Sequence, residues 1–305
     1  MQVRLLGTAA GGGFPQWNCG CVNCEGVRRG TIRARPRTQS CVAVSADGRR
    51  WFLLNASPDV RVQIESFAPL LPRGSVRGTG IQGIVLTNAD LDHTLGLLVL
   101  REGGRLSVHA TSSVRRALDE GLHLSEVLDR YGGVDWRQPP TSAAPLACAD
   151  GTLSGLSYAA FPVPGKLPRY REGRASPSGE DTVGYQLVDE STGKRLVYVP
   201  GLAALDRDVL TRLQTADVVL LDGTFWSDDE MRTAGAGSTS AREMGHLPVG
   251  SEDGSLTTLA SLPAARKIYV HINNTNPILR EDSPERQAVE NAGVEVGWDG
   301  MEFTL

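Results

Sequence analysis

Ile81-Gln-Gly-Ile-Val-Leu-Thr87 runs directly into Asn88-Ala-Asp90-Leu-Asp92-His93, the most informative segment of the chain. Its first half is a short apolar run typical of a buried strand, whereas its second half carries polar side chains that can bind a metal. A lone aspartate after a strand is usually a turn former or a helix cap. A metal site is therefore indicated only if other strands end in similar groups.

Two later strands do end in this way. The predicted strand Val218–Asp222 ends in a carboxylate, and the predicted strand Lys267–His271 ends in an imidazole. Strand ends that share one sheet edge bring together side chains that are far apart in the sequence. Two imidazoles and two carboxylates there would suit a divalent transition metal with open positions for water or substrate. The predicted ligands are Asp92, His93, Asp222 and His271.

The rest of the chain mixes short apolar runs with helical segments. Further predicted strands are Val3–Gly7, Cys41–Ser45, Trp51–Asn55, Leu106–Ala110, Tyr158–Val163, Val183–Val188, Leu196–Val199, Val294–Trp298 and Glu302–Leu305. The predicted helices are Pro58–Phe67, Thr94–Leu100, Ser112–Glu120, Ala204–Gln214, Ser255–Ala260 and Ser283–Asn291. This order favours an α/β fold of two packed sheets with helices outside. The segments 132–151 and 164–181 are predicted to be loops or lids within one domain that spans residues 1–305.

Composition and charge narrow the function classes. The chain has 31 Lys and Arg against 35 Asp and Glu, so it lacks the basic excess typical of nucleic-acid enzymes. Nowhere do about 18 apolar residues run together, and the first residues do not form a signal peptide. We therefore expect a cytoplasmic protein with no membrane insertion and no nucleic-acid partner.

Three of the five cysteines crowd into Cys19-Gly-Cys21-Val-Asn-Cys24. An odd number of cysteines in a chain without export signals argues against a disulfide framework. Clustered thiolates favour tetrahedral zinc, so we predict a structural zinc loop at about residues 19–24. Three reduced cysteines without a metal remain the alternative.

The motifs resemble those of a known superfamily. Asn88-x-Asp90-x-Asp92-His93 is similar to the His-x-His-x-Asp-His motif of metallo-β-lactamases, with two positions altered. End-to-end similarity to the pyrroloquinoline quinone (PQQ) biosynthesis protein B family is carried by segments 6–19, 88–93, 161–166, 222–226, 244–246 and 271–277. The resemblance implies a metallo-β-lactamase fold, an αββα sandwich of two mixed β-sheets flanked by helices.

The departures from the superfamily motif predict one metal rather than two. Asn88 and Asp90 stand where dinuclear hydrolases have histidine ligands, and no histidine lies between His123 and His246 to supply a third. The remaining donors favour mononuclear Fe(II), with manganese or zinc left open. Asp90 and His246 are the candidates for proton transfer, and His246 corresponds to a region where phosphodiesterase relatives place a catalytic histidine.

Two further assignments follow from the resemblance. A phosphodiesterase relative completes a similar cysteine triplet with a histidine at the position of Asn274, so Asn274 is the candidate fourth zinc ligand. PQQ and its precursors are rich in carboxylates, which Arg side chains bind as a fork. Lys166, Arg169 and Arg171 are therefore candidate substrate-binding residues, although a solvated surface run is the ordinary alternative.

The resemblance leaves three functions open. The first is hydroxylation of a tyrosine-derived PQQ precursor by iron and dioxygen. The second is binding of PQQ or its precursor for transport towards the periplasm, and the third is phosphodiester or ester hydrolysis. Fold alone does not choose among them. The altered motif argues against the hydrolase, and a homodimer is left open.

Overall fold

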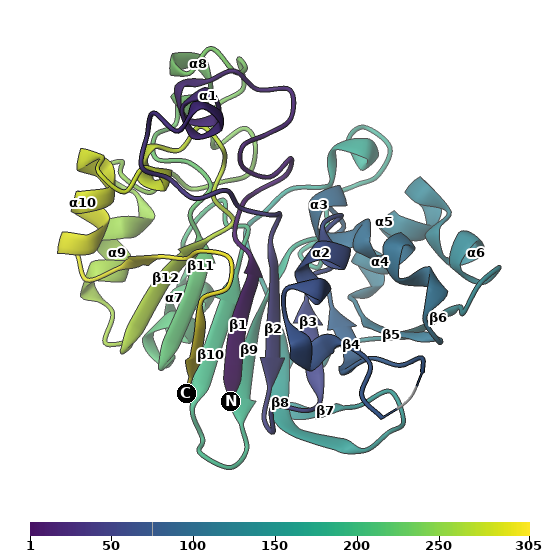
Figure 1. The fold of residues 1–305 in the computed structure, drawn as a ribbon. Coiled ribbons are helices and arrows are strands. Elements are labelled where there is room, and N and C mark those ends of the chain that lie inside the picture. The colour runs from purple at the N-terminus through teal and green to yellow at the C-terminus, as the bar shows by residue number, and fades with distance from the viewer. Residues whose placement is uncertain (75) are drawn as a thin grey trace.

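The computed structural model describes residues 1–74 and 76–305. Within these described residues, two seven-stranded sheets pack face to face, and helices cover the outer face of each (Figure 1). The sandwich matches the expected αββα arrangement. Both chain termini lie at one end of the sheets, and the cysteine-bearing segment lies at the other (Figure 1).

The first sheet has the strand order β14-β1-β2-β3-β4-β5-β6. Its strands are β1 (Gln2–Gly7), β2 (Cys41–Ser45), β3 (Trp51–Leu54), β4 (Ile81–Val85), β5 (Leu106–His109), β6 (Val134–Arg137) and β14 (Glu302–Thr304). Strands β3 to β6 run parallel, and β14, β1, β2 and β3 pair antiparallel. The sheet is therefore mixed, with its parallel part on the side that carries β4.

The second sheet has the order β13-β12-β11-β10-β9-β8-β7. Its strands are β7 (Ala144–Ala147), β8 (Leu153–Pro162), β9 (Val183–Asp189), β10 (Arg195–Val199), β11 (Val218–Asp222), β12 (Arg266–Val270) and β13 (Glu295–Val296). Strands β10 to β13 are parallel. Strand β11 is buried on both faces, since Leu220 packs between the sheets while Val219 and Leu221 pack under helices. Burial on both faces explains its unbroken apolar run.

Helices complete the outer layers (Figure 1). Over the first sheet lie α2 (Val60–Glu65), α3 (Leu91–Thr94), α4 (Gly96–Val99), α5 (Ser112–Leu122) and α6 (Leu124–Leu128). Over the second lie α7 (Arg207–Gln214), α9 (Ser255–Ser261) and α10 (Pro284–Asn291). The short helices α1 (Val22–Arg29) and α8 (Glu230–Thr233) lie together beyond the strand ends. The 3-10 turns η1 to η4 span Ala68–Leu70, Leu100–Glu102, Arg169–Arg171 and Pro277–Leu279.

Local signals explain where the predictions succeed. Helix α10 begins as expected, because the Ser283 side chain accepts a hydrogen bond from the Arg286 N–H and Pro284 occupies the first turn. The prediction of an irregular segment over 132–151 is wrong, since β6 and β7 lie within it. Both are edge strands of four residues, and Pro145 is tolerated at such an edge.

Within the described part of the chain, no helix is both long and apolar enough to cross a membrane.

Candidate metal centres

The three ligand-bearing strand ends meet at one end of the sandwich. Helix α3 begins after Asp90, which places Asp92 and His93 in its first turn. Strand β11 ends in Asp222, and the neighbouring parallel strand β12 leads into His271. His271 has a φ of 55°, a left-handed conformation that is rare for a residue with a side chain and turns the backbone sharply at this point. Long-range sheet pairing therefore assembles the cluster.

Asp92, His93 and His271 form one potential metal-binding triad. The Asp92 carboxylate Oδ2 lies 3.1 Å from His271 Nε2 and 3.8 Å from His93 Nε2. His93 is 1% exposed, and its Nε2 has no hydrogen-bond partner among the described residues. A buried nitrogen without a partner is costly unless something binds it. The donor set and this nitrogen therefore fit a metal ligated by imidazoles and a carboxylate.

Asp222, His246 and His271 form a second triad that shares His271 with the first. His246 Nδ1 lies 2.6 Å from Asp222 Oδ2, and the His246 and His271 rings stack with centroids 5.5 Å apart. Asp222 Oδ2 also accepts the Leu202 N–H at 2.9 Å. The structure thus brings together all four predicted ligands as two overlapping triads and adds His246, a residue that the sequence analysis named as a catalytic candidate and not as a metal ligand.

Thr224 is a site residue that the sequence analysis missed. Its hydroxyl lies 2.7 Å from His271 Nδ1 and 2.5 Å from Asp222 Oδ1. This contact holds the Nδ1 edge of the His271 ring, so that Nε2 faces Asp92. The signal was present, because Thr224 follows directly in the Asp222-Gly-Thr motif.

Burial and charge shift the pKa values of this cluster. Burial depresses the pKa of His93 to about 4, so its imidazole is neutral near pH 7. Burial and the charge of Asp92 raise the pKa of Asp90 to about 6. Burial opposes ionisation of Asp92 too, but His93 and a hydrogen bond from His271 hold its pKa well below its usual value. Carboxylates gathered at a buried site attract a cation, which supports the metal assignment.

The basic loop divides into two kinds of residue. The side chain of Lys166 lies against Gly245 and pairs with Glu172 at 3.4 Å, and its charge opposes the rise in the pKa of Asp90. Arg169 is exposed. Arg171 is buried and forms an ion pair with Glu120 on α5, a contact that the prediction did not include. This ion pair ties the loop to α5.

Tyr170 fixes the same loop near the cluster. Its hydroxyl donates a hydrogen bond of 2.9 Å to the carbonyl of Ala89, between Asn88 and Asp90. The loop thus reaches the strand end that carries the altered motif. This contact could not be predicted from the sequence, because its partners are 81 residues apart.

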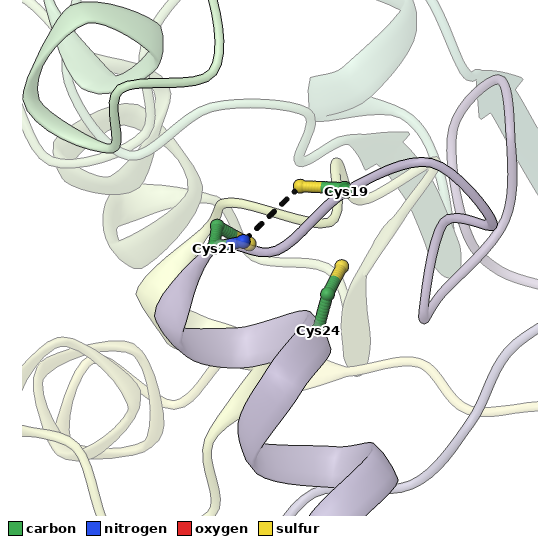
Figure 2. Close-up of side chains that lie close together, drawn as sticks. All are labelled: Cys19, Cys21 and Cys24. Carbon is green, nitrogen blue, oxygen red and sulfur yellow. Dashed lines mark hydrogen bonds between the residues drawn. The ribbon is translucent and has the colours of Figure 1, made fainter.

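The cysteines form a separate cluster (Figure 2). The Sγ atoms of Cys19, Cys21 and Cys24 lie within 4.8 Å of one another, and all five cysteines of the chain are free. Cys19 and Cys21 precede α1, whereas Cys24 lies on it, so the predicted loop continues into a helix. The backbone N–H of Cys21 points at the Cys19 sulfur at 3.4 Å, as the dashed line in Figure 2 shows.

Asn274, the candidate fourth zinc ligand of the sequence analysis, lies against this cluster. Its carboxamide lies 3.1, 3.6 and 3.3 Å from the sulfurs of Cys19, Cys21 and Cys24, measured from Nδ2. A half-turn of the amide places Oδ1 at the same position, since the two ends are alike in shape. Three thiols and a carboxamide oxygen around one point fit tetrahedral zinc.

The fold and a sequence match define the class of protein. The Beta-lactamase superfamily domain profile matches residues 50–272, and the two mixed sheets with outer helices are those of a metallo-β-lactamase fold. A diphosphatase of the PhnP family shares the fold, with 19% identity and a TM-score of 0.68 over 100% of this chain and 97% of that one.

Relatives over the whole length identify the family within this class. Coenzyme PQQ synthesis protein B of Pseudomonas putida strain F1 is 46% identical over 306 residues, and that of Azoarcus sp. strain BH72 is 48% identical over 307, with complete coverage of both chains in each case. A crystal structure of Zn(2+)-bound PqqB from Methylobacterium extorquens is 41% identical, covers all of both chains and gives a TM-score of 0.91. The chain belongs to the coenzyme PQQ synthesis protein B family.

Proposed function

We propose that the protein acts in PQQ biosynthesis as an Fe(II)-dependent hydroxylase of a tyrosine-derived precursor. The main support is the imidazole–carboxylate cluster, in which His93 keeps a buried nitrogen with no partner among the described residues. Asn88 and Asp90 occupy the positions of two further histidine ligands in superfamily hydrolases, which disfavours a two-metal hydrolytic site. Family membership supports the pathway.

The reaction replaces one ring C–H bond by C–OH. It consumes one dioxygen and two electrons from an external reductant, and the second oxygen atom leaves as water after taking up two protons. Fe(II) held by Asp92, His93, Asp222 and His271 would supply redox chemistry that zinc lacks. His246, bonded to Asp222, and Asp90 are the groups placed to move protons.

The test is an anaerobic reconstitution. Protein loaded with Fe(II) receives ascorbate and a tyrosine whose ring carries a carboxylate-bearing substituent, and dioxygen is then admitted. We expect a product sixteen mass units heavier, and we expect His93→Ala to lose it while keeping its circular dichroism spectrum. Equal turnover by zinc-loaded, iron-free protein would contradict the proposal. Tight binding of PQQ without turnover would instead favour the carrier, and phosphodiester cleavage would favour the hydrolase.

We further propose that Lys166 and Arg169 recognise substrate carboxylates. Arg169→Ala should weaken binding of the same probe roughly tenfold, because an exposed arginine can form a fork with a carboxylate at the loop. Arg171→Ala should instead lower the melting temperature, because it breaks the ion pair with Glu120. Titration calorimetry measures the loss of affinity, and thermal unfolding measures the loss of stability. Unchanged affinity in Arg169→Ala would favour the alternative that the loop is an ordinary solvated surface.

A further inference from the structure

Asn88 and Asp90 stand where the superfamily motif has histidines, yet both side chains make well-defined contacts. The Asn88 Oδ1 lies 2.7 Å from His93 Nδ1, and the Asn88 Nδ2 donates to Asp90 Oδ2 at 2.8 Å. Asn88 is 6% exposed and His93 is 1% exposed, so the bond between them is shielded from water, whereas the bond to Asp90 is only partly buried. The three side chains form one hydrogen-bonded chain that runs from Asp90 through Asn88 to His93 Nδ1.

The direction of each bond in this chain is determined. The backbone N–H of Asp90 donates to Asn88 Oδ1 at 3.2 Å, which requires an oxygen at that end of the amide. The Asp90 carboxylate accepts from the other end, which requires the amide nitrogen there. Asn88 therefore presents only an acceptor to His93, and His93 must donate from Nδ1. Its Nε2 is then the nitrogen with the free lone pair.

We propose that Asn88 and Asp90 are positioning residues that fix the ring orientation and the tautomer of His93 for metal binding. In this arrangement Asp90 orients the Asn88 amide, and the amide orients the imidazole. The residues at the two altered motif positions would thus support metal binding by His93 rather than bind a second metal themselves. The inference rests on the proposed metal site but not on hydroxylation.

The first test measures the tautomer directly. In metal-free wild-type protein labelled with ¹⁵N, long-range ¹H–¹⁵N spectra should show the proton of His93 on Nδ1. In Asn88→Leu, which keeps the branched shape of the side chain but removes the acceptor, the proton should redistribute to Nε2. A wild-type ring protonated on Nε2 would overturn the proposal, whether or not any variant folds.

The second test measures metal affinity by Co²⁺ titration of protein whose thiolate cluster already holds zinc. Asn88→Leu and Asp90→Ala should weaken Co²⁺ binding by about 10- to 100-fold, the usual cost of losing a partner of a ligating histidine. Asp90→Asn should restore most of the affinity, because its amide oxygen still accepts from Asn88. Wild-type affinity in both Asn88→Leu and Asp90→Ala would refute the positioning role.

Asn23→Leu is the matched control. Asn23 is 5% exposed, and its Nδ2 donates to the carbonyls of Asn274 and Asn276, away from His93. This variant should lose stability without weakening Co²⁺ binding at the imidazoles. Equal losses of Co²⁺ affinity in Asn23→Leu and Asn88→Leu would mean that any buried amide has this effect, and the specific role would fail. Because no substrate is involved, these outcomes are independent of whether the protein proves to be a hydroxylase.

Discussion

The two candidate metal clusters are built in different ways. The thiolate cluster takes its three sulfurs from residues 19–24 and only Asn274 from elsewhere. The imidazole–carboxylate cluster takes His93 from α3 beside one sheet, and Asp222 and His271 from strand ends of the other. In the first, a metal would organise a short, irregular segment. In the second, two packed sheets already hold the donors, so the fold organises the metal.

The largest expected difference is in turnover. Asp222→Ala should reduce the hydroxylated product at least about 100-fold, because it removes a ligand that also holds His246 and Thr224. Cys21→Ser should keep most of the turnover at temperatures where it is folded. Product is measured by mass spectrometry, with circular dichroism as the folding control. If Cys21→Ser were as inactive as Asp222→Ala while still folded, the two clusters would not be separable in this way.

Stability should depend more on the thiolate cluster than on the imidazole–carboxylate cluster, the reverse of the expectation for turnover. Zinc at a structural thiolate site contributes directly to folding, so Cys21→Ser should lower the free energy of unfolding of zinc-loaded protein by about 3–5 kcal/mol. Cys148→Ser is the control, since Cys148 is a buried thiol outside the cysteine cluster, and it should retain full zinc content. Denaturant unfolding and metal analysis check both. If wild-type protein without zinc were as stable as zinc-loaded protein, the structural role of the zinc would be contradicted.

The smallest expected difference is in protons released on metal binding. Burial raises the pKa of Cys24 to about 12, so this thiol must lose a proton to bind zinc. His93, with a pKa of about 4, is already neutral at pH 7 and releases none. Zinc uptake by the thiols should therefore release about two to three protons, and uptake by the other cluster about one or fewer.

Calorimetry in buffers of different ionisation enthalpy measures these proton counts. Affinity should accordingly rise more steeply with pH at the thiolate cluster, because deprotonated thiols are favoured as pH rises. Imidazole-cluster variants such as His93→Ala leave the thiolate reaction to be measured alone. If the two clusters released equal numbers of protons on binding metal, the predicted difference between them would be wrong.

Most of the correct predictions came from patterns that are visible within a short window of the sequence. The ligand-bearing strands could be found because an apolar run followed by polar residues is visible within a dozen positions. Strands β6 and β7 could not, because short edge strands are partly exposed and lack a clear period. The ion pair of Arg171 could not be predicted, because its partner Glu120 lies 51 residues away and on a helix. The His246–Asp222 bond was missed for a similar reason, since it depends on the path of a 24-residue connection.

His271 and Asn274 belong one to each cluster, yet they lie three positions apart in the chain. An inserted or deleted residue between them would displace a donor of one cluster or the other. Evolution can therefore lengthen the chain freely at exposed hairpins such as 190–194, between β9 and β10, but not within this segment. Among descendants of this gene, the interval from His271 to Asn274 should keep its length even where the surrounding sequence has drifted.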